Sequence, residues 1–491
     1  MNLLHIISDQ HNAGCTGYEG HPQAITPNLD RLAGESVRFN RCYTQSPICT
    51  PSRVSIFSGQ YCHNHGYYAL CGPRPDRLPS FMGHFKEHGY RTAGIGQLHT
   101  PCAPRNWLED HLDLFGDTFR TVDWQPQGTG TAWVRDLEER GLLDKEEFHL
   151  SFTGQLTEPT ERASFVPFEF SQEGWCVREA IRFIEEQDGP FCMQVSLERP
   201  HDPCIPAQEF WDMYTDDLDL PATFHNPCDH RPPHFRKQHQ SWRERSGEDF
   251  MRRARLRWRG YLASITHMDH AVGHLLDYLD RTGLAKDTIV VYNADHGGYM
   301  SQFGIREKAP GICSEAVCRV PFLWRVPGVT EAGALNDALV ENVDIAPTFT
   351  ALAGLPPMPT VDGKDISALL AGSDEPVREV AVTEHPQSKA LRWKNWRFVH
   401  YQEQMFGEDV GELCDGEADP DETNNLYHDP DHQDVVNACR KKLLEWLIAT
   451  TRVRTAMIIR NSGRRNDGER VYEFDGDGKI GHLDFRSDNY R

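Results

Sequence analysis

Short apolar runs alternate along the chain with longer segments of helical periodicity. The apolar runs predict strands at LLHIIS (3–8), RTAGIG (91–96), FCMQVSL (191–197) and DTIVVYN (287–293). Helical patterns fall at residues 27–36, 51–59, 79–88, 175–187, 252–282 and 345–353. Each predicted strand is apolar along most of its length, as expected for a strand covered by helices on both faces. The pattern therefore predicts an α/β fold with a large, mostly parallel central sheet.

Two parts of the chain depart from this pattern. Residues 202–250 are rich in Pro, His, Arg and Asp and show little periodicity, which indicates an inserted lobe or long loop. Near residue 375 the sequence becomes more polar and its elements shorter. We expect a catalytic α/β domain over residues 1–375 and a smaller C-terminal α+β subdomain with a tail over 376–491. The tail contains strand-like pieces and would pack across a subunit boundary in a homo-oligomer.

Polar side chains that suit metal binding or acid–base chemistry follow each of the four predicted strands. In chain order these are Asp9 and Gln10, Gln97 and His99, His201 and Asp202, and Asp295 and His296. In open α/β sheets, ligands bind at the carboxyl ends of the strands. Four segments far apart in sequence should therefore meet at one edge of the sheet.

The residues after the first and last of these strands form a candidate metal site. Asp9, Gln10, Asp295 and His296 offer two carboxylates, an amide oxygen and an imidazole. Oxygen-rich sets suit Ca²⁺, Mg²⁺ or Mn²⁺, and the single imidazole shifts the preference toward Mn²⁺ or Zn²⁺. Asp-Gln and Asp-His-Gly-Gly could equally be turn and cap sequences.

Composition excludes several classes of partner. The chain has 491 residues, 38% hydrophobic and 25% charged, with a formal net charge of −22. Nucleic acid is therefore not an expected partner, because phosphate binding needs a basic face. We find no run of about 18 apolar residues and no secretion signal, so we expect no membrane span and a cytoplasmic location. The 14 cysteines show no framework spacing and should be mostly reduced.

The stretch CTPSR (49–53) precedes a helical run with Pro51 near its first turn. This places Cys49 at a helix N-terminus, where backbone N–H groups favour anions and lower the pKa of a thiol. A buried, packed cysteine is an equal alternative. A cysteine phosphatase loop is excluded, because it needs an arginine six residues after the cysteine and Ser55 stands there. A zinc site from Cys42, Cys49, Cys62, His63, His65 and Cys71 matches no close-paired ligand spacing.

With these residues in view, the chain resembles the sulfatase family of the alkaline-phosphatase-like superfamily. CTPSR followed by VSIFSGQ resembles the sulfatase signature, and IISDQHNAGCTGYEG is similar to the first metal-binding segment of the family. SLERPHDPCIPAQEF looks like its Pro-His-x-Pro segment. The stretch YLASITHMDHAVGHLLDYLDRTGLAKDTIVVYNADHGG resembles its long helix, strand and second metal segment. VDIAPTFTALAGLPPMPTVDGKDISALL and ADPDETNNL are similar to later landmarks.

The resemblance implies hydrolysis of sulfate monoesters. In this family the signature cysteine is oxidised to Cα-formylglycine, so Cys49 would be a precursor and a formylglycine-generating enzyme a maturation partner. The aldehyde hydrates to a geminal diol, of which one hydroxyl attacks sulfur while the ester bond breaks and the alcohol leaves. The second hydroxyl then loses its proton and expels sulfate by breaking the carbon–oxygen bond, which restores the aldehyde. A serine at this position could not release sulfate by this route, because it lacks the second hydroxyl.

The resemblance also implies roles for particular residues. Asp9, Gln10, Asp295, His296 and modified residue 49 would hold one divalent metal, with Ca²⁺ as the first expectation and Mn²⁺ or Mg²⁺ as alternatives. Arg53 would hold the formylglycine, and His99 would take the diol proton. His201 and Lys308 would bind the sulfate and help the leaving oxygen depart; a loop histidine and a solvated lysine are the simpler alternatives.

Two residues differ from the common family pattern. Gln10 stands where many sulfatases have a second Asp, and Gln97 where many have a lysine. The neutral Gln97 makes the anion pocket less cationic and should favour monoanionic esters. Phosphonate monoesters and phosphodiesters are monoanions as well, so a hydrolase of these esters is the close alternative, and the Asp-Gln-His opening also resembles the arylsulfatase/phosphonate monoester hydrolase branch.

Two readings from other classes stay open. A chain whose Cys49 is never oxidised could bind an anionic ester without turnover. A metal-dependent phosphotransferase with Thr50 or Ser52 as the nucleophile is the other, although neither occupies the first position of the motif. The substrate, a small-molecule or saccharide ester, is not specified by the sequence. Variable segments 100–175 and 202–250 and the C-terminal subdomain should determine it, with Trp107, Trp124, Trp133 and Trp242 as candidate contacts.

Overall fold

The computed structural model describes residues 1–70, 72–102, 105–118, 132–141, 162–164, 166–308 and 313–452. The predicted subunit-boundary tail, Cys71 and Trp124 lie outside these ranges. In the described part of the chain, no helix has both the length and the apolar character needed to cross a bilayer.

The centre of the molecule is an eight-stranded sheet with the order β11-β2-β10-β7-β1-β6-β4-β5. The four predicted strands are present as β1 (Asn2–Ser8), β4 (Arg91–Gly96), β6 (Phe191–Leu197) and β7 (Thr288–Ala294), and they are neighbours in it. They pair in parallel, as does β5 (Leu114–Asp117) with β4. Beyond β7, β10 (Phe322–Arg325) runs antiparallel to it and to β2 (Val37–Phe39), and β11 (Leu335–Asn336) completes the edge. The predicted α/β class with a mostly parallel sheet is confirmed.

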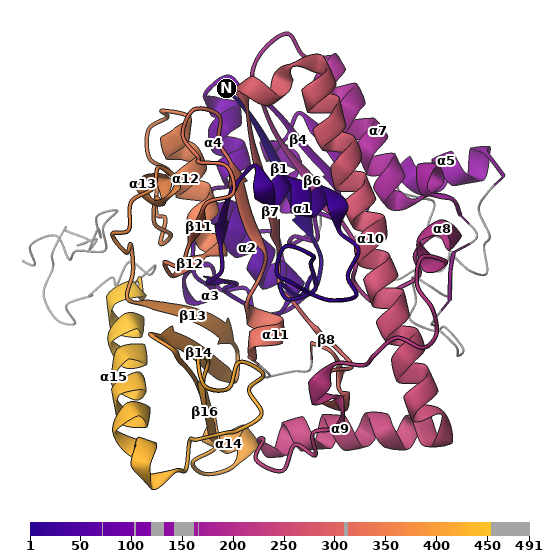
Figure 1. The fold of residues 1–491 in the computed structure, drawn as a ribbon. Coiled ribbons are helices and arrows are strands. Elements are labelled where there is room, and N and C mark those ends of the chain that lie inside the picture. Colours follow the sequence, from indigo (N-terminus) through magenta and orange to yellow (C-terminus); the bar gives the residue numbers. More distant parts are fainter. Residues whose placement is uncertain are drawn as a thin grey trace, which may run out of the picture.

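Helices cover both faces of this sheet because alternate strand residues point to opposite sides. Leu4 and Ile6 of β1 belong to one apolar core, whereas Leu3 and Ile7 belong to another. The first core is closed by α1 (Pro27–Gly34), α7 (Gln172–Glu185) and α10 (Phe250–Thr282); the second by α2 (Cys49–Ser58), α4 (Phe81–Glu87) and α12 (Ile345–Leu352). Figure 1 shows the two groups of helices on either side of the strands.

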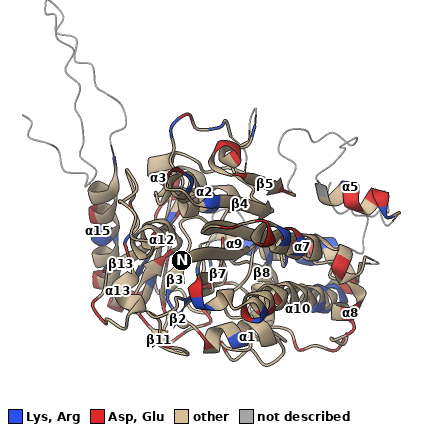
Figure 2. Ribbon diagram, turned by 90° about the horizontal axis from the view of Figure 1, so that it is seen from above, with Lys and Arg blue, Asp and Glu red and all other residues tan. Residues whose placement is uncertain are grey.

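Local sequence explains where several of these helices begin and end. Ser80 and Ser171 cap α4 and α7 by accepting hydrogen bonds from backbone N–H groups three residues later. The 33-residue α10 ends at Gly283, whose φ of 76° is the left-handed conformation that favours glycine. Figure 2 shows charged residues of both signs on the outer helices, while β1, β6 and β7 contain none.

The segment 202–250, for which the sequence predicts an inserted lobe or long loop, contains the 14-residue helix α9 (Pro233–Ser246), which the sequence did not predict. It also holds α8 (Gln208–Trp211) and the short 3₁₀ segments η3 (Ala222–His225) and η4 (Gly247–Asp249). The large apolar residues that α9 buries are Phe235 and Trp242, seven residues apart. Two apolar positions in a basic stretch are too few to produce a helical periodicity in the sequence.

The C-terminal part is an antiparallel sheet of β13 (Val380–His385), β14 (Ser388–Trp393), β15 (Trp396–Tyr401) and β16 (Gly411–Asp415). Helix α15 (Gln433–Thr450) packs on one face, where Val382, Leu391 and Phe398 meet Val436 and Cys439. This confirms a smaller C-terminal α+β subdomain. The boundary at residue 375 and the independence of residues 376–491 stay predictions.

A buried ion-pair network joins this sheet to the segment before α9. Glu412 accepts hydrogen bonds from Arg231 at 2.6 Å and from Arg397 at 3.0 Å, and all three side chains are almost fully buried. Glu422 contacts Arg397 from the other side. Removing one partner would leave a buried charge unpaired, so the network holds the two segments together.

The remaining elements are short. The strands are β3 (Cys42–Tyr43), β8 (Tyr299–Met300), β9 (Arg306–Glu307) and β12 (Val340–Glu341), and the helices are α3 (Cys62–His65), α5 (Ala132–Glu139), α11 (Glu315–Cys318), α13 (Ser367–Leu370) and α14 (Glu403–Phe406). The 3₁₀ segments are η1 (Trp107–His111), η2 (Phe168–Phe170), η5 (Leu284–Asp287), η6 (Gln302–Gly304), η7 (Asn342–Asp344) and η8 (Pro430–His432).

Candidate active site

The carboxyl ends of the central parallel strands bring four segments of the chain to one edge of the sheet. Asp9 follows β1, and its backbone N–H donates to the carbonyl of Leu197 at the end of β6. Asp295 follows β7, and its N–H donates to the carbonyl of Ser8 at the end of β1. Backbone hydrogen bonds between neighbouring strand ends therefore fix the two carboxylates side by side, as the sheet topology predicts.

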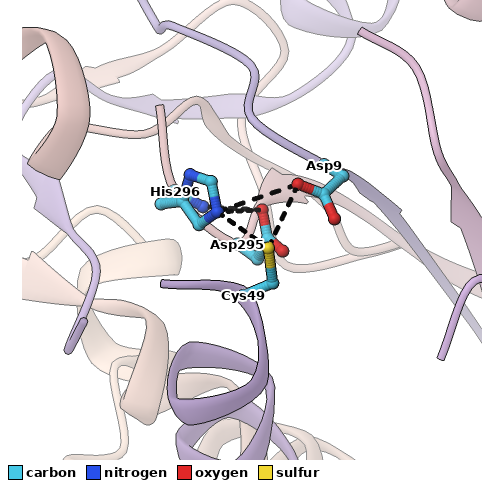
Figure 3. Close-up of side chains that lie close together, drawn as sticks. All are labelled: Asp9, Cys49, Asp295 and His296. Carbon is cyan, nitrogen blue, oxygen red and sulfur yellow. Dashed lines mark hydrogen bonds and ion pairs between the residues drawn. The ribbon is translucent and has the colours of Figure 1, made fainter. Parts of the chain in front are cut away.

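Helix α2 adds Cys49 to these two carboxylates. Asp9, Cys49, Asp295 and His296 are buried, and one potential ligand atom from each lies within 4.8 Å of the others. The Cys49 Sγ is 3.2 Å from His296 Nε2 and 3.7 Å from Asp9 Oδ1. Figure 3 shows the four side chains pointing toward one another, with Cys49 at the first turn of α2. In the described part of the chain, this is the one cluster of its kind.

The thiol at this position is not activated in the folded chain. Burial, followed by the negative charge of Asp9, raises the pKa of Cys49, although Lys308 acts in the opposite direction. The expectation that the helix N-terminus lowers this pKa is therefore wrong, because desolvation outweighs the helix end. As an unmodified cysteine, residue 49 is a protonated thiol and a weak nucleophile at neutral pH.

Arg53 lies one turn after Cys49 on α2, and its guanidinium is fully buried. Its Nε donates to Asp295 Oδ2 at 2.8 Å, and Nη2 donates to Asp9 Oδ2 at 3.2 Å. Nη1 donates to the Gln97 carbonyl at 2.6 Å and to Ser196 Oγ at 2.7 Å. The Arg53 side chain thus contacts residues that follow β1, β4 and β7, and one residue within β6. Its positive charge neutralises part of the charge of the two carboxylates.

His296 has the geometry of a metal-binding imidazole. Its Nδ1 lies 2.7 Å from the carbonyl of Gly297, which makes Nδ1 the donor and leaves the Nε2 lone pair facing Asp9 and Cys49. Burial, with a smaller contribution from the charge of Lys308, lowers the pKa of His296 to about 4. A neutral imidazole whose other nitrogen binds a carbonyl is typical of metal-bound histidine.

Asp9 is ionised at the same place. Burial alone would raise the pKa of Asp9, but the charges of His201, Lys308 and Arg53 outweigh burial and hold it well below its ordinary value. Gln10 follows with a positive φ of 65°, and its backbone N–H donates to Asp295 Oδ1 at 3.2 Å. Its buried Nε2 has no hydrogen-bond partner among the described residues. Two carboxylates, one imidazole and an adjacent amide therefore fit a divalent cation.

Lys308 reaches this cluster from the segment after β9. Its Nζ lies 2.8 Å from Cys49 Sγ, 3.1 Å from His296 Nε2 and 3.2 Å from His201 Nε2. Burial favours the neutral amine, but the carboxylates of Asp9 and Asp295 act in the opposite direction, and the pKa of Lys308 is raised. The ammonium is therefore retained beside residue 49, and the alternative of a solvated surface lysine does not hold.

His201 is held by the segment that follows β6. Its Nδ1 lies 2.6 Å from the carbonyl of Asp202, so Nε2 faces Lys308. Asp202 itself receives a hydrogen bond from Arg257 of α10 and one from Arg306 of β9, each at 3.1 Å. This carboxylate links the His201 segment to the hairpin that carries Lys308.

His99 and Gln97 follow β4 at the same edge. Burial lowers the pKa of His99 to about 3, with Asp9 acting in the opposite direction, so its ring is neutral at neutral pH. The Gln97 backbone contacts Arg53, and its buried side-chain Oε1 has no hydrogen-bond partner among the described residues. Both side chains are buried, and the charges of Asp9, Arg53 and Lys308 act on the ring of His99.

The remaining candidate residues make contacts that stabilise the fold and do not join the cluster around residue 49. His63 Nδ1 lies 2.9 Å from Glu384 Oε1, and His65 Nε2 lies 2.9 Å from Ser55 Oγ. Cys42 and Cys62 are buried elsewhere, so the described members of the zinc alternative do not assemble around one point. Trp107 and Trp242 are core residues.

A cavity of about 420 Å³ lies apart from the cluster. Asn12, His21, Trp258, Tyr299 and Arg319 are among its lining residues, and Asp9, Cys49, Asp295, His296 and Lys308 are not. It has no part in the chemistry proposed below.

Sequence reasoning missed Arg257 and Arg306. A buried arginine at a core position of a helix, as Arg257 is on α10, indicates a buried acidic partner. The position of Arg257 among core residues of the predicted helix could have indicated such a partner. Its identity could not be predicted, because Asp202, Arg257 and Arg306 lie far apart in sequence.

Known proteins match the chain in both sequence and structure. The Sulfatase family matches residues 1–355, and the family described as N-sulphoglucosamine sulphohydrolase, C-terminal, matches residues 311–448. The choline-sulfatase of Rhizobium meliloti is 31% identical over 447 residues, which cover 87% of this chain and 83% of that protein. The arylsulfatase of Clostridium perfringens is 26% identical over 473 residues, 91% and 94% of the two chains.

Solved structures agree on the fold. The phosphonate monoester hydrolase of Agrobacterium radiobacter superimposes with a TM-score of 0.75 and 22% identity, covering 92% of this chain and 96% of that one. The phosphonate monoester hydrolase from Silicibacter pomeroyi gives a TM-score of 0.77 with 20% identity, covering 94% and 98%. At this identity the likeness concerns the fold alone. Because the family match spans residues 1–355 and the choline-sulfatase is similar across most of both chains, this chain belongs to the sulfatase family of sulfuric ester hydrolases.

Proposed function

We propose that the chain hydrolyses sulfate monoesters at the cluster around residue 49, with that residue converted to formylglycine. The observation that carries the proposal is the contact of residue 49 with three groups at once. Its side chain lies 2.8 Å from the Lys308 ammonium, 3.2 Å from His296 Nε2 and 3.7 Å from an Asp9 oxygen. A nucleophile placed between a cation-binding set and a fixed ammonium suits attack on an anionic ester.

Asp9, Gln10, Asp295 and His296 would hold one divalent cation, with Ca²⁺ as our first choice because oxygen ligands predominate. When bound, the cation supplies Lewis-acid polarisation of the ester and lowers the pKa of a neighbouring hydroxyl. The acidic set is prepared for this role, since Asp9 is ionised and His296 is neutral at neutral pH.

As a hydrated aldehyde, residue 49 supplies one hydroxyl that attacks sulfur and a second whose deprotonation expels sulfate and restores the aldehyde. His99, which follows β4 at the same edge of the sheet and is neutral at neutral pH, is our candidate for accepting that proton. Lys308 and His201, 3.2 Å apart, would bind the sulfate oxygens and protonate the leaving alcohol. Arg53 fixes Asp9 and Asp295, and it would orient residue 49 through α2.

The charge of the pocket favours a monoanion. Gln97 is neutral, so Lys308 and His201 are the basic side chains seen to approach each other beside residue 49. A dianionic phosphate monoester would bring one more negative charge to this place than a sulfate monoester does. The same reasoning admits phosphonate monoesters and phosphodiesters, which makes them the second candidate substrates.

Relatives suggest which alcohols to test. Choline sulfate follows from the name of the relative at 31% identity, and aryl and N-acetylglucosamine 6-sulfate esters follow from others. The family also suggests a formylglycine-generating enzyme as a maturation partner. Every cysteine in the described part of the chain is an unbridged, buried thiol, which supports a reducing, cytoplasmic location.

The first experiment measures the mass of the peptide that contains residue 49, on protein produced together with a formylglycine-generating enzyme. We expect a loss of about 18 mass units, the change from thiol to aldehyde at an activated nucleophile. Cys49→Ala serves as the matched control that cannot be converted. An unchanged thiol in wild-type protein would contradict the mechanism and favour a non-catalytic ester-binding protein.

A substrate panel then tests the ester class on converted protein. It contains choline sulfate, 4-nitrophenyl sulfate, N-acetylglucosamine 6-sulfate, a phenylphosphonate monoester and 4-nitrophenyl phosphate. We expect the highest kcat/KM on one of the sulfates and the lowest on the phosphate monoester. A preference for the phosphate monoester would overturn the charge argument, and a preference for the phosphonate would move the chain to the second candidate function.

A further inference from the structure

Two histidines on α10 lie close together and are not part of the cluster around residue 49. His270 and His274 are four residues apart, and both are exposed. Their Nε2 atoms are 3.2 Å from each other. We propose that this pair is a second metal site that binds a borderline divalent ion of the Zn²⁺, Cu²⁺ or Ni²⁺ class.

The separation of the two nitrogens is the one that such an ion requires. With metal–nitrogen bonds of about 2.0–2.1 Å, two imidazoles on a tetrahedral ion lie about 3.3 Å apart, and two adjacent ones on a square-planar ion about 2.9 Å apart. The observed 3.2 Å falls between these values. Residues four apart share one face of a helix, which is the arrangement that paired histidines use to bind zinc in helical motifs.

A third residue holds both rings in place. The ring of Phe168, which begins η2, stacks on His274 with the centroids 5.3 Å apart and an angle of 11° between the planes. The same ring lies edge-on to His270 at 4.6 Å and 82°. Phe168 is itself 8% exposed, so it is anchored in the core of the protein. Because the ring positions are set by packing, binding an ion would cost little side-chain ordering.

The neighbouring side chains on α10 that could serve as further ligands of the histidine pair are already engaged in other contacts. Asp277 lies one turn further along α10, and its carboxylate binds Arg31 at 2.6 Å. His267, one turn earlier, is fully buried and its ring nitrogens face Ser171 and the backbone of Ala207. The two imidazoles are therefore the ligands, and water would complete the coordination. Oxygen-preferring Ca²⁺ and Mg²⁺ are not expected to bind here.

The chain provides a matched control on another helix. His84 and His88 are also four residues apart, on and just after α4, and their ring centroids are 4.4 Å apart. Their nitrogens are engaged differently: His84 Nε2 lies 2.8 Å from the Pro356 carbonyl, and His88 Nδ1 lies 2.8 Å from the His84 carbonyl. The α4 pair has the sequence spacing without the converging nitrogens.

The test uses the full-length, calcium-loaded enzyme, titrated with Zn²⁺ by calorimetry and with Cu²⁺ by electron paramagnetic resonance. Four proteins are compared: wild type, His270→Gln, His274→Gln, and the control pair His84→Gln with His88→Gln. Any zinc taken up at the cluster of Asp9 and Asp295 is common to all four, so the difference between them reports the helix pair. The unfolding midpoint of each variant is measured first, and we expect it to be unchanged because all the substituted α10 side chains are exposed.

We expect wild type and the control pair to take up one more equivalent of Zn²⁺ than either α10 variant, or to bind it at least about tenfold more tightly. The Cu²⁺ spectrum should show two coupled nitrogens that are lost in the α10 variants alone. Equal zinc uptake and affinity in all four proteins would overturn the proposal, as would the same loss in the control pair. Neither result bears on sulfate ester hydrolysis, which the proposal does not use.

Discussion

Replacing Lys308 by methionine tests the proposed chemistry most directly, because the change removes the ammonium while keeping an unbranched side chain only one atom shorter. Nζ lies 2.8 Å from the side-chain atom of residue 49, so an ester bound there places a sulfate oxygen about one hydrogen bond away from Nζ. Two unit charges about 3 Å apart at an effective dielectric constant of about 20 interact by roughly 5 kcal/mol. One sulfate oxygen carries about a third of a charge in the ground state, which gives roughly 2 kcal/mol.

Negative charge that develops on the leaving oxygen increases this contribution. We estimate a total of about 2–4 kcal/mol in the transition state, similar to the effect of removing one oxyanion-hole donor. At 1.36 kcal/mol for each factor of ten, Lys308→Met should lower kcat/KM about 30- to 1000-fold. The loss should be larger for an alkyl sulfate than for 4-nitrophenyl sulfate, because the nitrophenolate leaves without help.

The assay measures kcat and KM of wild type, Lys308→Met and Lys442→Met on both substrates. Lys442 lies on α15 and binds Glu379, so its replacement controls for the loss of one positive charge. The fraction of formylglycine at residue 49 is measured by mass in each protein and used to correct the rates. If Lys308→Met kept kcat/KM within about threefold of wild type, the transition-state role would be refuted. Equal losses on the two substrates would refute help to the leaving oxygen.

Substitutions at three further positions test the site and its surroundings. Asp202→Asn weakens the contacts to Arg257 and Arg306 and should lower kcat about tenfold with little change in KM. Asp202→Glu keeps the carboxylate and should recover part of the loss. An unchanged kcat in Asp202→Asn would show that this carboxylate does not position His201. Arg53→Gln leaves two buried carboxylates without their partner and should lower the free energy of unfolding by about 3–5 kcal/mol in chelator, and by less in excess Ca²⁺. Urea unfolding measures both values, and an equal loss under the two conditions would argue against a cation between the carboxylates. Burial lowers the pKa of His5 to about 4, so the folded chain binds fewer protons than the unfolded chain between pH 6.5 and 4. The contribution of His5 to the free energy of unfolding therefore falls by about 3 kcal/mol as the pH drops through that window. His5→Gln should flatten this part of the curve of unfolding free energy against pH, and an unchanged slope would contradict the assignment.

The positions of Asp9 and Asp295 could be predicted because sheet topology alone determines them. A residue that follows a buried parallel strand must lie at the carboxyl edge, whichever side chain it carries. The approach of Cys49 and Lys308 to that edge depends on how α2 and the β8–β9 hairpin pack, and apolar periodicity carries no information about packing between elements. For those residues the family resemblance was needed.

Helix α9 and the partners of Asp202 were not predicted, for two different reasons. A helix that buries Phe235 and Trp242 as its large apolar residues has almost no periodic signal, since basic residues occupy its other faces. Arg257 and Arg306 meet Asp202 only because α10, β9 and the end of β6 converge in space. Such a contact between three distant segments follows from the finished fold and not from any local pattern.

Under the proposed conversion of Cys49 to formylglycine, the burial of this residue limits when the conversion could occur. The Cys49 side chain is 1% exposed, with Asp9, His296 and Lys308 around its sulfur. On the proposed maturation, a modifying enzyme would have to bring this cysteine into its own active site, which the burial of the side chain in the folded chain opposes. Oxidation would therefore have to happen while the first fifty or so residues are still extended, before β1 and β7 pair. Molecules that fold before oxidation would keep an unmodified cysteine at residue 49. The active fraction of a preparation would therefore depend on the rate of oxidation relative to the rate of folding.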